Sequence, residues 1–322
     1  MTVLADNAGI VSTLLTGRLQ RLLLASALVL LGVILSACNQ RQETSGPRYG
    51  DAPREKTAVR SCTVAVHPLH NPAKLTEAYQ PLIDYLNKRL SGVRLQLESS
   101  RDYASFEQKY RSRTPEFILP NPWQTLQAIQ SGYRVIASAG ESHDFKGVFV
   151  VRKDSGINRP ADLKGKAVSY PSPTALAACI MPQWYLHRHG ININRDIENR
   201  YVGSQESSIM NAYLGHSAAG ATWPPPWRAF QKDHPEEAAK LKVVWETESL
   251  INNSFMIRED LPKALREQIL SLLLELPKSE EGRTILQGME TARFIAASND
   301  DYDLVRRYVA RFEHEVRPVE QR

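Results

Sequence analysis

The sequence predicts an α/β fold with two lobes for the part of the chain that follows residue 57. Three observations predict it. Strand-like and helix-like segments alternate as β-α-β-α-β over residues 59–119, which is typical of a parallel sheet flanked by helices. A second series of this kind covers 167–245. Two strongly apolar strands, at 147–152 and 254–257, flank the second series, and we expect them to cross between the lobes.

The first α/β series contains an amphipathic helix whose apolar residues recur at helical spacing, from Leu75 to Leu90. Gly92 follows it and is expected to act as the C-cap glycine. The predicted elements of this series are a strand at 59–66, a helix at 75–90, a strand at 93–97, a helix at 102–110 and a strand at 116–119.

The second series repeats this alternation and is followed by helices alone. Its predicted elements are a strand at 167–170, a helix at 174–187, a strand at 200–202, a helix at 205–214 and a strand at 243–245. Helices are then predicted at 262–276, 280–287 and 302–312. No internal repeat at the periods of solenoid proteins is present.

The N-terminus has the pattern of an export signal. Arg18 and Arg21 precede an apolar run over 22–35, which is short for a membrane span. The run ends in Leu35-Ser36-Ala37-Cys38, which resembles the lipobox of bacterial lipoproteins, where the cysteine is diacylated. A simple secretory signal with an incidental cysteine is the alternative. We expect a signal peptide over 1–37 and lipidation at Cys38.

The segment 38–57 is polar and contains glycines and prolines, so we expect a flexible tether. The rest of the 322-residue chain is long enough for one large or two medium domains. Its net charge is +5, but it has no basic run with interleaved aromatic residues, so nucleic acid is not expected as a partner. Cys62 and Cys179 lie in apolar sequence, which favours two buried free thiols over a disulfide.

The sequence contains no recognisable catalytic motif. The patterns G-x-S-x-G, H-E-x-x-H, G-x-x-x-x-G-K-[ST] and G-x-G-x-x-G are all absent. His187 and His189 stand at a predicted helix end without nearby carboxylates, and His67 and His70 stand in a proline-rich loop. We therefore predict no catalytic residues, no metal site and no cofactor.

Three strand-to-helix loops carry polar side chains at the place where open α/β sheets bind ligands. They cover 120–123, 170–174 and 203–207. Asn121, Thr174 and Ser204 are natural helix N-caps, and capping alone is one explanation for each of them. The other is a shared ligand site, because two helix N-termini that converge from one lobe form an anion site.

Several short segments stand in the order seen in the periplasmic phosphonate- and phosphate-type (PhnD-like) binding proteins of ABC importers. They are PLIDYL at 81–86, DY at 102–103, GYRVIA at 132–137, FKGVFVVRKDS at 145–155, ADLKGK at 161–166, YVGS at 201–204 and GRTIL at 282–286. The chain resembles this family over nearly all of its length after Thr57. The resemblance implies a type II periplasmic-binding-protein fold, with lobe 1 at 58–148 and 254–322 and lobe 2 at 149–253.

The sequence departs from the family at the expected ligand site. Residues 175–178, which are Ala-Leu-Ala-Ala, replace a serine-threonine-serine-glycine run, and Gln205 replaces a histidine. Ala218 or Ala219 replaces an acidic residue, which argues against an aminoalkyl ligand. The segment 222–227, Thr-Trp-Pro-Pro-Pro-Trp, is expected to be a rigid loop that either packs as a turn or contacts the ligand.

The resemblance implies a lipid-anchored solute-binding protein of an ABC importer. We expect it to act as a monomer at the periplasmic face of a bacterial membrane, with an inner-membrane permease as its partner. Its ligand is expected to be a small oxyanion of phosphonate or phosphate-ester type, with an apolar part facing tryptophans. The expected ligand-binding residues are Tyr103, Asn121, Trp123, Ser172, Thr174, Ser204, Gln205, Thr222 and Trp223. The alternative is a ligand-sensing lipoprotein that reports to a membrane signalling partner.

Overall fold

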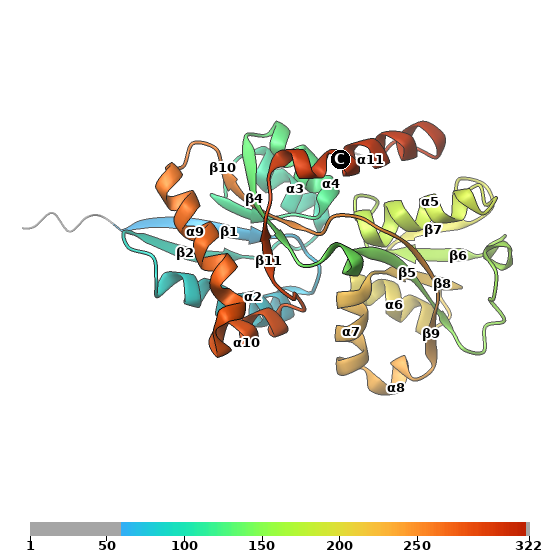
Figure 1. Ribbon diagram of the computed structural model, residues 1–322. Helices are drawn as coiled ribbons and strands as arrows, with labels where there is room; N and C mark the ends of the chain where they lie inside the picture. Colours follow the sequence, from blue (N-terminus) through green and yellow to red (C-terminus); the bar gives the residue numbers. More distant parts are fainter. Residues whose placement is uncertain (1–58, 320–322) are drawn as a thin grey trace, which may run out of the picture. The chain divides into compact units, whose positions relative to one another are not determined.

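The strands form two separate sheets in the computed structural model, which describes residues 59–319 (Figure 1). The six-stranded sheet has the order β11-β4-β10-β3-β1-β2, and the five-stranded sheet has the order β7-β6-β8-β5-β9. We call each sheet with its helices the six-stranded unit and the five-stranded unit. The predicted signal peptide, Cys38 and the tether lie outside the described residues. Within 59–319, no helix has the length and apolar character needed to cross a bilayer.

The six-stranded unit contains the first predicted series. Its strands are β1 (Arg60–Val66), β2 (Val93–Glu98), β3 (Phe117–Leu119), β4 (Tyr133–Ala139), β10 (Ser254–Arg258) and β11 (Phe294–Ala296). Its helices are α2 (Pro72–Asn87), α3 (Tyr103–Arg111), α4 (Pro122–Gln130), α9 (Lys263–Glu275) and α10 (Glu280–Gly288). Strand β1 pairs in parallel with β2 and β3, which confirms the predicted parallel arrangement. Strand β10 then pairs antiparallel with both β3 and β4.

Helix α2 begins and ends three residues earlier than predicted. Asn71 caps it by accepting a hydrogen bond from the backbone N–H of Lys74, and Pro72 suits the first turn because it lacks an N–H. The helix is capped at its C-terminus by Lys88. The prediction that Gly92 is the C-cap was therefore wrong; with φ of 73°, it lies in the turn that leads into β2.

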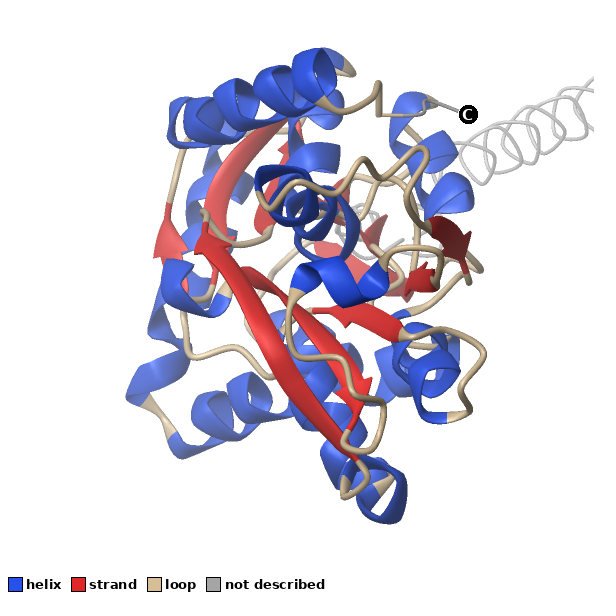
Figure 2. Ribbon diagram, turned by 90° about the vertical axis from the view of Figure 1, so that its right-hand side faces the viewer, coloured by secondary structure: helices blue, strands red, loops and turns tan. Residues whose placement is uncertain are grey.

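The five-stranded unit contains the second series, and helices surround its strands (Figure 2). Its strands are β5 (Lys146–Arg152), β6 (Ala167–Tyr170), β7 (Glu198–Tyr201), β8 (Ala219–Thr222) and β9 (Leu241–Ser249). Its helices are the π-helical turn η3 (Leu176–Ile180), α5 (Met181–Arg188), α6 (Gln205–Tyr213), α7 (Pro224–Asp233) and α8 (Pro235–Ala238). Short helical turns elsewhere in the described chain, in either unit or between them, are η1 (Ser142–Asp144), η2 (Pro160–Leu163), η4 (Leu276–Lys278) and η5 (Asn299–Tyr302).

The segment 222–227 is not a loop, as the sequence had suggested. Thr222 ends β8, Trp223 is the N-cap position, and Pro224 to Pro226 form the first turn of α7. Prolines fit there because the first N–H groups of a helix have no intrahelical acceptor. Strand β8 was missed because its sequence, Ala-Gly-Ala-Thr, is small and shows no alternation.

The chain passes between the two sheets twice, at residues 140–145 and 250–253. The two passages lie side by side. The N–H of Ala139 donates to the carbonyl of Asn253 at 2.6 Å, and the N–H of Leu250 donates to the carbonyl of Phe145 at 3.0 Å. The C-terminal helix α11 (Asp303–Glu315) lies over α4 and extends toward α5 (Figure 1).

Each unit has a buried apolar core. Trp123, Phe117 and Phe255 are buried in the core of the six-stranded unit, which continues into η3 and α5. A second core surrounds Phe149 and Tyr170 in the five-stranded unit. Cys62 and Cys179 are both buried and neither forms a disulfide, which confirms the expectation of two buried thiols over a disulfide.

Candidate functional site

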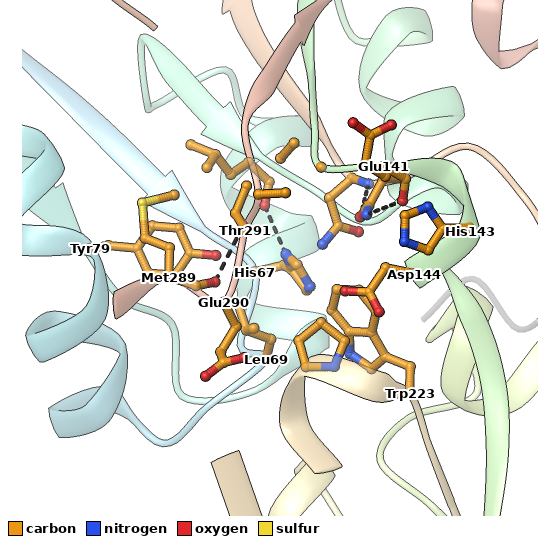
Figure 3. Close-up of a pocket in the computed structure, with 17 residues that line it drawn as sticks. His67, Leu69, Tyr79, Glu141, His143, Asp144, Trp223, Met289, Glu290 and Thr291 are labelled. Atoms are coloured by element: carbon orange, nitrogen blue, oxygen red, sulfur yellow. Dashed lines mark hydrogen bonds between the residues drawn. The ribbon is translucent and has the colours of Figure 1, made fainter. Parts of the chain in front are cut away.

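Three cavities follow the seam between the two units. The central cavity, of about 10 Å³, has room for about one water molecule. It is lined by His67, Tyr103, Asn121, Phe145, Ala175, Leu176, Ala177, Ala178, Gln205, Trp223 and Asn253. The hinge-side cavity, of about 50 Å³, shares His67, Trp223 and Asn253 with it (Figure 3). The outer cavity, of about 250 Å³, shares Tyr103 with it.

On the side of the five-stranded unit, the central cavity is lined by the start of η3, including Leu176, Ala177 and Ala178. The N–H of Ala175 donates to Ser172, and the N–H of Ile180 donates back to Ala175 at 3.1 Å. Within the described part of the chain, the backbone offers no acceptor to the N–H groups of Leu176, Ala177 and Ala178. We call these three N–H groups the amide cradle. Free N–H groups at the start of a helix favour an anion.

Asn121 faces the cradle from the six-stranded unit and has two functions. Its Oδ1 accepts hydrogen bonds from the N–H groups of Trp123 and Gln124, so it is the predicted N-cap of α4. Its Nδ2 donates at 3.2 Å to the carbonyl of Thr174 in the five-stranded unit. Capping is thus confirmed for Asn121, and the same side chain also lines the central cavity.

A second polar bridge joins the units through Tyr103 and Gln205. The Nε2 of Gln205 donates to the Tyr103 hydroxyl at 3.1 Å, and its Oε1 accepts a hydrogen bond from Thr222 at 2.9 Å. Burial raises the pKa of Tyr103, so the phenol stays protonated. Gln205 is thus held in one orientation at the N-terminus of α6.

Glu107 on α3 is a functional candidate that the sequence analysis missed. Its side chain is buried, and its Oε1 accepts hydrogen bonds from Thr174 at 2.7 Å and from Gln124 at 3.3 Å. Its Oε2 lies 3.4 Å from Arg111. Burial raises the pKa of this carboxyl, and these partners offset part of that shift. Thr174 is not the N-cap that was predicted: Ala175 holds the N-cap position of η3, and the hydroxyl of Thr174 instead donates to Glu107.

His67, which the sequence analysis set aside, lines both the central and the hinge-side cavity. It is buried, and its Nδ1 lies 2.9 Å from the carbonyl of Leu119. Burial lowers its pKa to about 4. In the described chain no cluster of three His, Cys, Asp or Glu side chains is placed to hold a metal ion.

The predicted site residues fall into three groups. Tyr103, Asn121, Gln205 and Trp223 line the central cavity, and Tyr103, Ser172 and Thr174 line the outer cavity. The others line none of these three cavities. Trp123 is packed in the core, Ser204 caps α6 by accepting from the N–H of Ser207, and Thr222 holds Gln205. Their predicted ligand contacts have no support in this geometry.

The residues from which an aminoalkyl ligand was argued against, Ala218 and Ala219, lie at the end of β8 that is away from the site. Ala219 begins β8, pairs with Val168 and is buried in the core, whereas Thr222 at the other end of β8 is near the site. Acidic side chains do line the cavities of the seam, and the buried one among them, Glu107, comes from the six-stranded unit.

The chain matches the family described as ABC transporter, phosphonate, periplasmic substrate-binding protein over residues 64–302. The probable ABC transporter phosphite binding protein PhnD1 of Prochlorococcus marinus (strain MIT 9301) is 25% identical over 181 residues, which are 52% of this chain and 61% of that protein. This chain thus spans less than two thirds of that relative's length. The tetrathionate sensor histidine kinase TtrS of Salmonella typhimurium is 25% identical over 155 residues, 46% of this chain and 26% of that protein.

A solved structure of Prochlorococcus marinus PhnD1 in complex with methylphosphonate has the same fold. It is similar with a TM-score of 0.73 and 21% identity, and the match covers 79% of this chain and 98% of that one. The predicted type II periplasmic-binding-protein fold is thereby confirmed. Because the family match covers most of the described residues, the chain belongs to the phosphonate-type periplasmic substrate-binding proteins of ABC transporters.

Proposed function

We propose that the protein is the solute-binding component of an ABC importer and binds one small oxyanion at the seam between its units. The amide cradle carries this proposal. The three N–H groups of the cradle and the carboxamides of Asn121 and Asn253, which line the same cavity, can donate hydrogen bonds to an anion. No buried positive charge is needed. Such a set suits a phosphonate or phosphate ester, because backbone donors and a helix N-terminus stabilise negative charge.

Closure of the units around the ligand is part of the proposal. The bonds from Asn121 to Thr174 and from Gln205 to Tyr103 join the two units only when they meet. The passages at 140–145 and 250–253 are the places for a hinge, since the sheets on either side are continuous. The bodies that would move are the six-stranded and five-stranded units. They correspond to the predicted lobes, 58–148 with 254–322 and 149–253, except that residues 146–148 belong to β5 and move with the five-stranded unit.

Thermal-shift measurements on the mature chain test the ligand class. Methylphosphonate, phosphite and phosphate should raise the melting temperature with increasing concentration, because a ligand that binds only the folded state stabilises it. Calorimetry should give one site per chain and no turnover. Stabilisation by a neutral or cationic solute together with no response to any oxyanion would contradict the proposal.

A pair of capping variants separates binding from helix stability. Asn121→Ser keeps a side-chain cap for α4 but removes the donor to Thr174, so ligand affinity should fall at least about fivefold with little loss of stability. Ser204→Ala removes the cap of α6 and should cost about 1 kcal/mol of stability with a smaller effect on affinity. The reverse pattern would place the ligand away from Asn121.

Attachment to the membrane through Cys38 belongs to the same proposal and rests on the sequence Leu35-Ser36-Ala37-Cys38. Two acyl chains suffice for stable anchoring. Cys38→Ser should give a released protein or an uncleaved precursor when cells are fractionated. If the Cys38→Ser variant fractionates with membranes as the mature, acylated protein does, Cys38 is not the site of lipidation.

A sensing role is the second candidate, and the similarity to part of a sensor kinase favours it. The same closing units would then report the ligand to a membrane signalling partner. Co-purification from detergent-solubilised membranes distinguishes the two roles: an ABC permease retained in a ligand-dependent manner supports import, and a kinase or cyclase supports sensing.

A further inference from the structure

The side chain of His67 has a fixed tautomer. Its Nδ1 lies 2.9 Å from the carbonyl oxygen of Leu119, which can only accept a hydrogen bond. The hydrogen of the neutral ring is therefore on Nδ1, and Nε2 carries a lone pair. In Figure 3 the second ring nitrogen of His67 is on the side of the ring toward Asp144 and Trp223, which line the same cavity.

The ring stays neutral because it is buried. Only 3% of His67 is exposed, and burial lowers its pKa to about 4. The titratable groups near it or across the hinge-side cavity are His70, Tyr79, Tyr103, Glu141, His143, Asp144 and Glu290. Asp144 and Glu290 both form ion pairs with Arg228. The positive charge of Arg228 offsets their negative charge, so these carboxylates do little to favour a protonated His67.

Two hydrogen-bond acceptors at this place have no partner. Among residues 59–319, none donates to the Nε2 of His67. The Oδ1 of Asn253 is buried and also lacks a partner, and Asn253, only 7% exposed, lines the same two cavities as His67. A buried acceptor without a partner, such as the Oδ1 of Asn253, is costly, so it indicates a ligand that brings a donor, and the Nε2 of His67 is available to the same ligand because His67 lines the same cavities.

We propose that His67 selects the protonation state of the ligand: its Nε2 accepts a hydrogen bond from a hydroxyl of the bound oxyanion. The inference rests on the proposed function and names its substrate class. The site takes phosphonate, phosphite or phosphate species that retain a P–OH group and discriminates against sulfonates and sulfate, which have no such hydrogen near neutral pH. An anion without the hydroxyl would face the lone pair of Nε2 and leave it unsatisfied.

Methylphosphonate and methanesulfonate are matched probes. Below the second pKa of methylphosphonate, both are monoanions of similar shape, and only the phosphonate has a hydroxyl hydrogen. Calorimetry on the mature wild-type chain should give at least about tenfold tighter binding for methylphosphonate, as expected for a site built around a hydrogen-bonding hydroxyl. Equal affinity would overturn the inference while leaving the proposed oxyanion site intact, whereas no binding of either anion or of phosphite would overturn the proposed function.

Substitutions of His67 assign the discrimination to this residue. His67→Leu removes the acceptor and should reduce the methylphosphonate preference at least about fivefold, whereas His67→Gln, which can place an oxygen near the position of Nε2, should retain more of it. An unchanged preference in His67→Leu would overturn the role of His67.

The pH dependence of the wild-type protein tests the same idea without a variant. Methylphosphonate affinity should fall about tenfold per pH unit above the second pKa of the ligand, because the species with the hydroxyl becomes rare. Methanesulfonate does not titrate there, so its weaker binding should stay flat and serves as the control. Methylphosphonate binding that is independent of pH in this range would overturn the inference even if His67→Leu does not fold.

Discussion

At the scale of single residues, Glu107 connects the two units through a buried carboxylate. It accepts from Gln124 within its own unit and from Thr174 across the seam. Burial destabilises the charged carboxylate, so the pKa of Glu107 is raised despite these donors and the nearby Arg111. The closed arrangement is therefore sensitive to the protonation of one side chain.

Glu107→Gln should remove this sensitivity. Because the folded-state pKa is raised, the folded state binds the proton more tightly, and wild-type stability falls as pH rises from the ordinary pKa of glutamate, about 4.3, through the raised value. Glutamine keeps an acceptor for Thr174 without a charge. Melting temperatures across pH should show a difference in favour of the variant that grows over this window and is least below it.

Glu281→Gln is the control for this experiment. The pKa of Glu281 is lowered by Arg89 and Lys88, so removing its charge should give no gain, and any loss should appear at the higher pH values. A wild-type protein that becomes more stable than Glu107→Gln as pH rises would contradict the account of Glu107.

The sequence was informative about residues with a local function and silent about those with a tertiary one. The caps Asn121 and Ser204 follow from the short-range chemistry of helix starts, and both are confirmed. His67 and Glu107 matter because strand β1 and helix α3 bring them to the seam. A local sequence pattern cannot predict which side chains will be buried by contact with the other unit.

At the scale of elements, long periodic helices and apolar strands could be predicted, with shifts at their ends. The helix predicted from 174 instead begins with η3, a π-helical turn whose geometry depends on its packing against β5 and β8. It is this turn that aims the amide cradle at the cavity. Composition predicted a helix but could not predict this local widening.

Gly147 of β5 determines how close that turn can approach. A Cβ at this position would overlap the carbonyl oxygen of Ala177 and lie 2.8 Å from Pro182. Gly147→Ala should therefore displace η3, cost about 1–3 kcal/mol of stability and weaken oxyanion binding. Urea unfolding and calorimetry on the same samples measure the two effects.

Gly288 provides the matched control for Gly147. It ends helix α10, and a Cβ there would meet no atom within 4 Å. Gly288→Ala should be neutral or stabilising by up to about 1 kcal/mol, because alanine lowers the entropy of the unfolded chain. If Gly147→Ala behaves like this control, the close packing of β5 against η3 does not position the cradle.

At the scale of the whole molecule, the two-sheet fold could be predicted from many short sequence segments, each a weak match to the family, that stand in the family's order. Each sheet is built from a common α/β series. The path of the C-terminus was not predictable in this way. Helix α11 begins on the six-stranded unit, where Val305 and Phe312 are buried, and the chain then reaches the five-stranded unit. There Asn194 donates to the carbonyl of Val316 at 3.1 Å.

Arg317 completes this third connection between the units. Its guanidinium lies over Phe312 and donates to Gln183 Oε1 at 2.9 Å and to the carbonyl of Pro173 at 3.3 Å. Pro173 stands in the loop that carries Ser172 and Thr174 and leads into the amide cradle. The C-terminal segment therefore holds the binding loop against the six-stranded unit from outside the cavity.

Arg317→Ala should weaken ligand binding although Arg317 lines none of the cavities at the site. Losing charge-assisted hydrogen bonds should cost about 1–3 kcal/mol of stability without ligand, and a looser binding loop should raise the Kd of methylphosphonate further, mainly through faster dissociation. Arg306→Ala, which removes an exposed arginine paired with Asp303 on the same helix, should change both quantities little. Stopped-flow dissociation rates decide the matter, because a variant that is less stable but releases the ligand at the wild-type rate would show that the C-terminal segment supports the fold without positioning the binding loop.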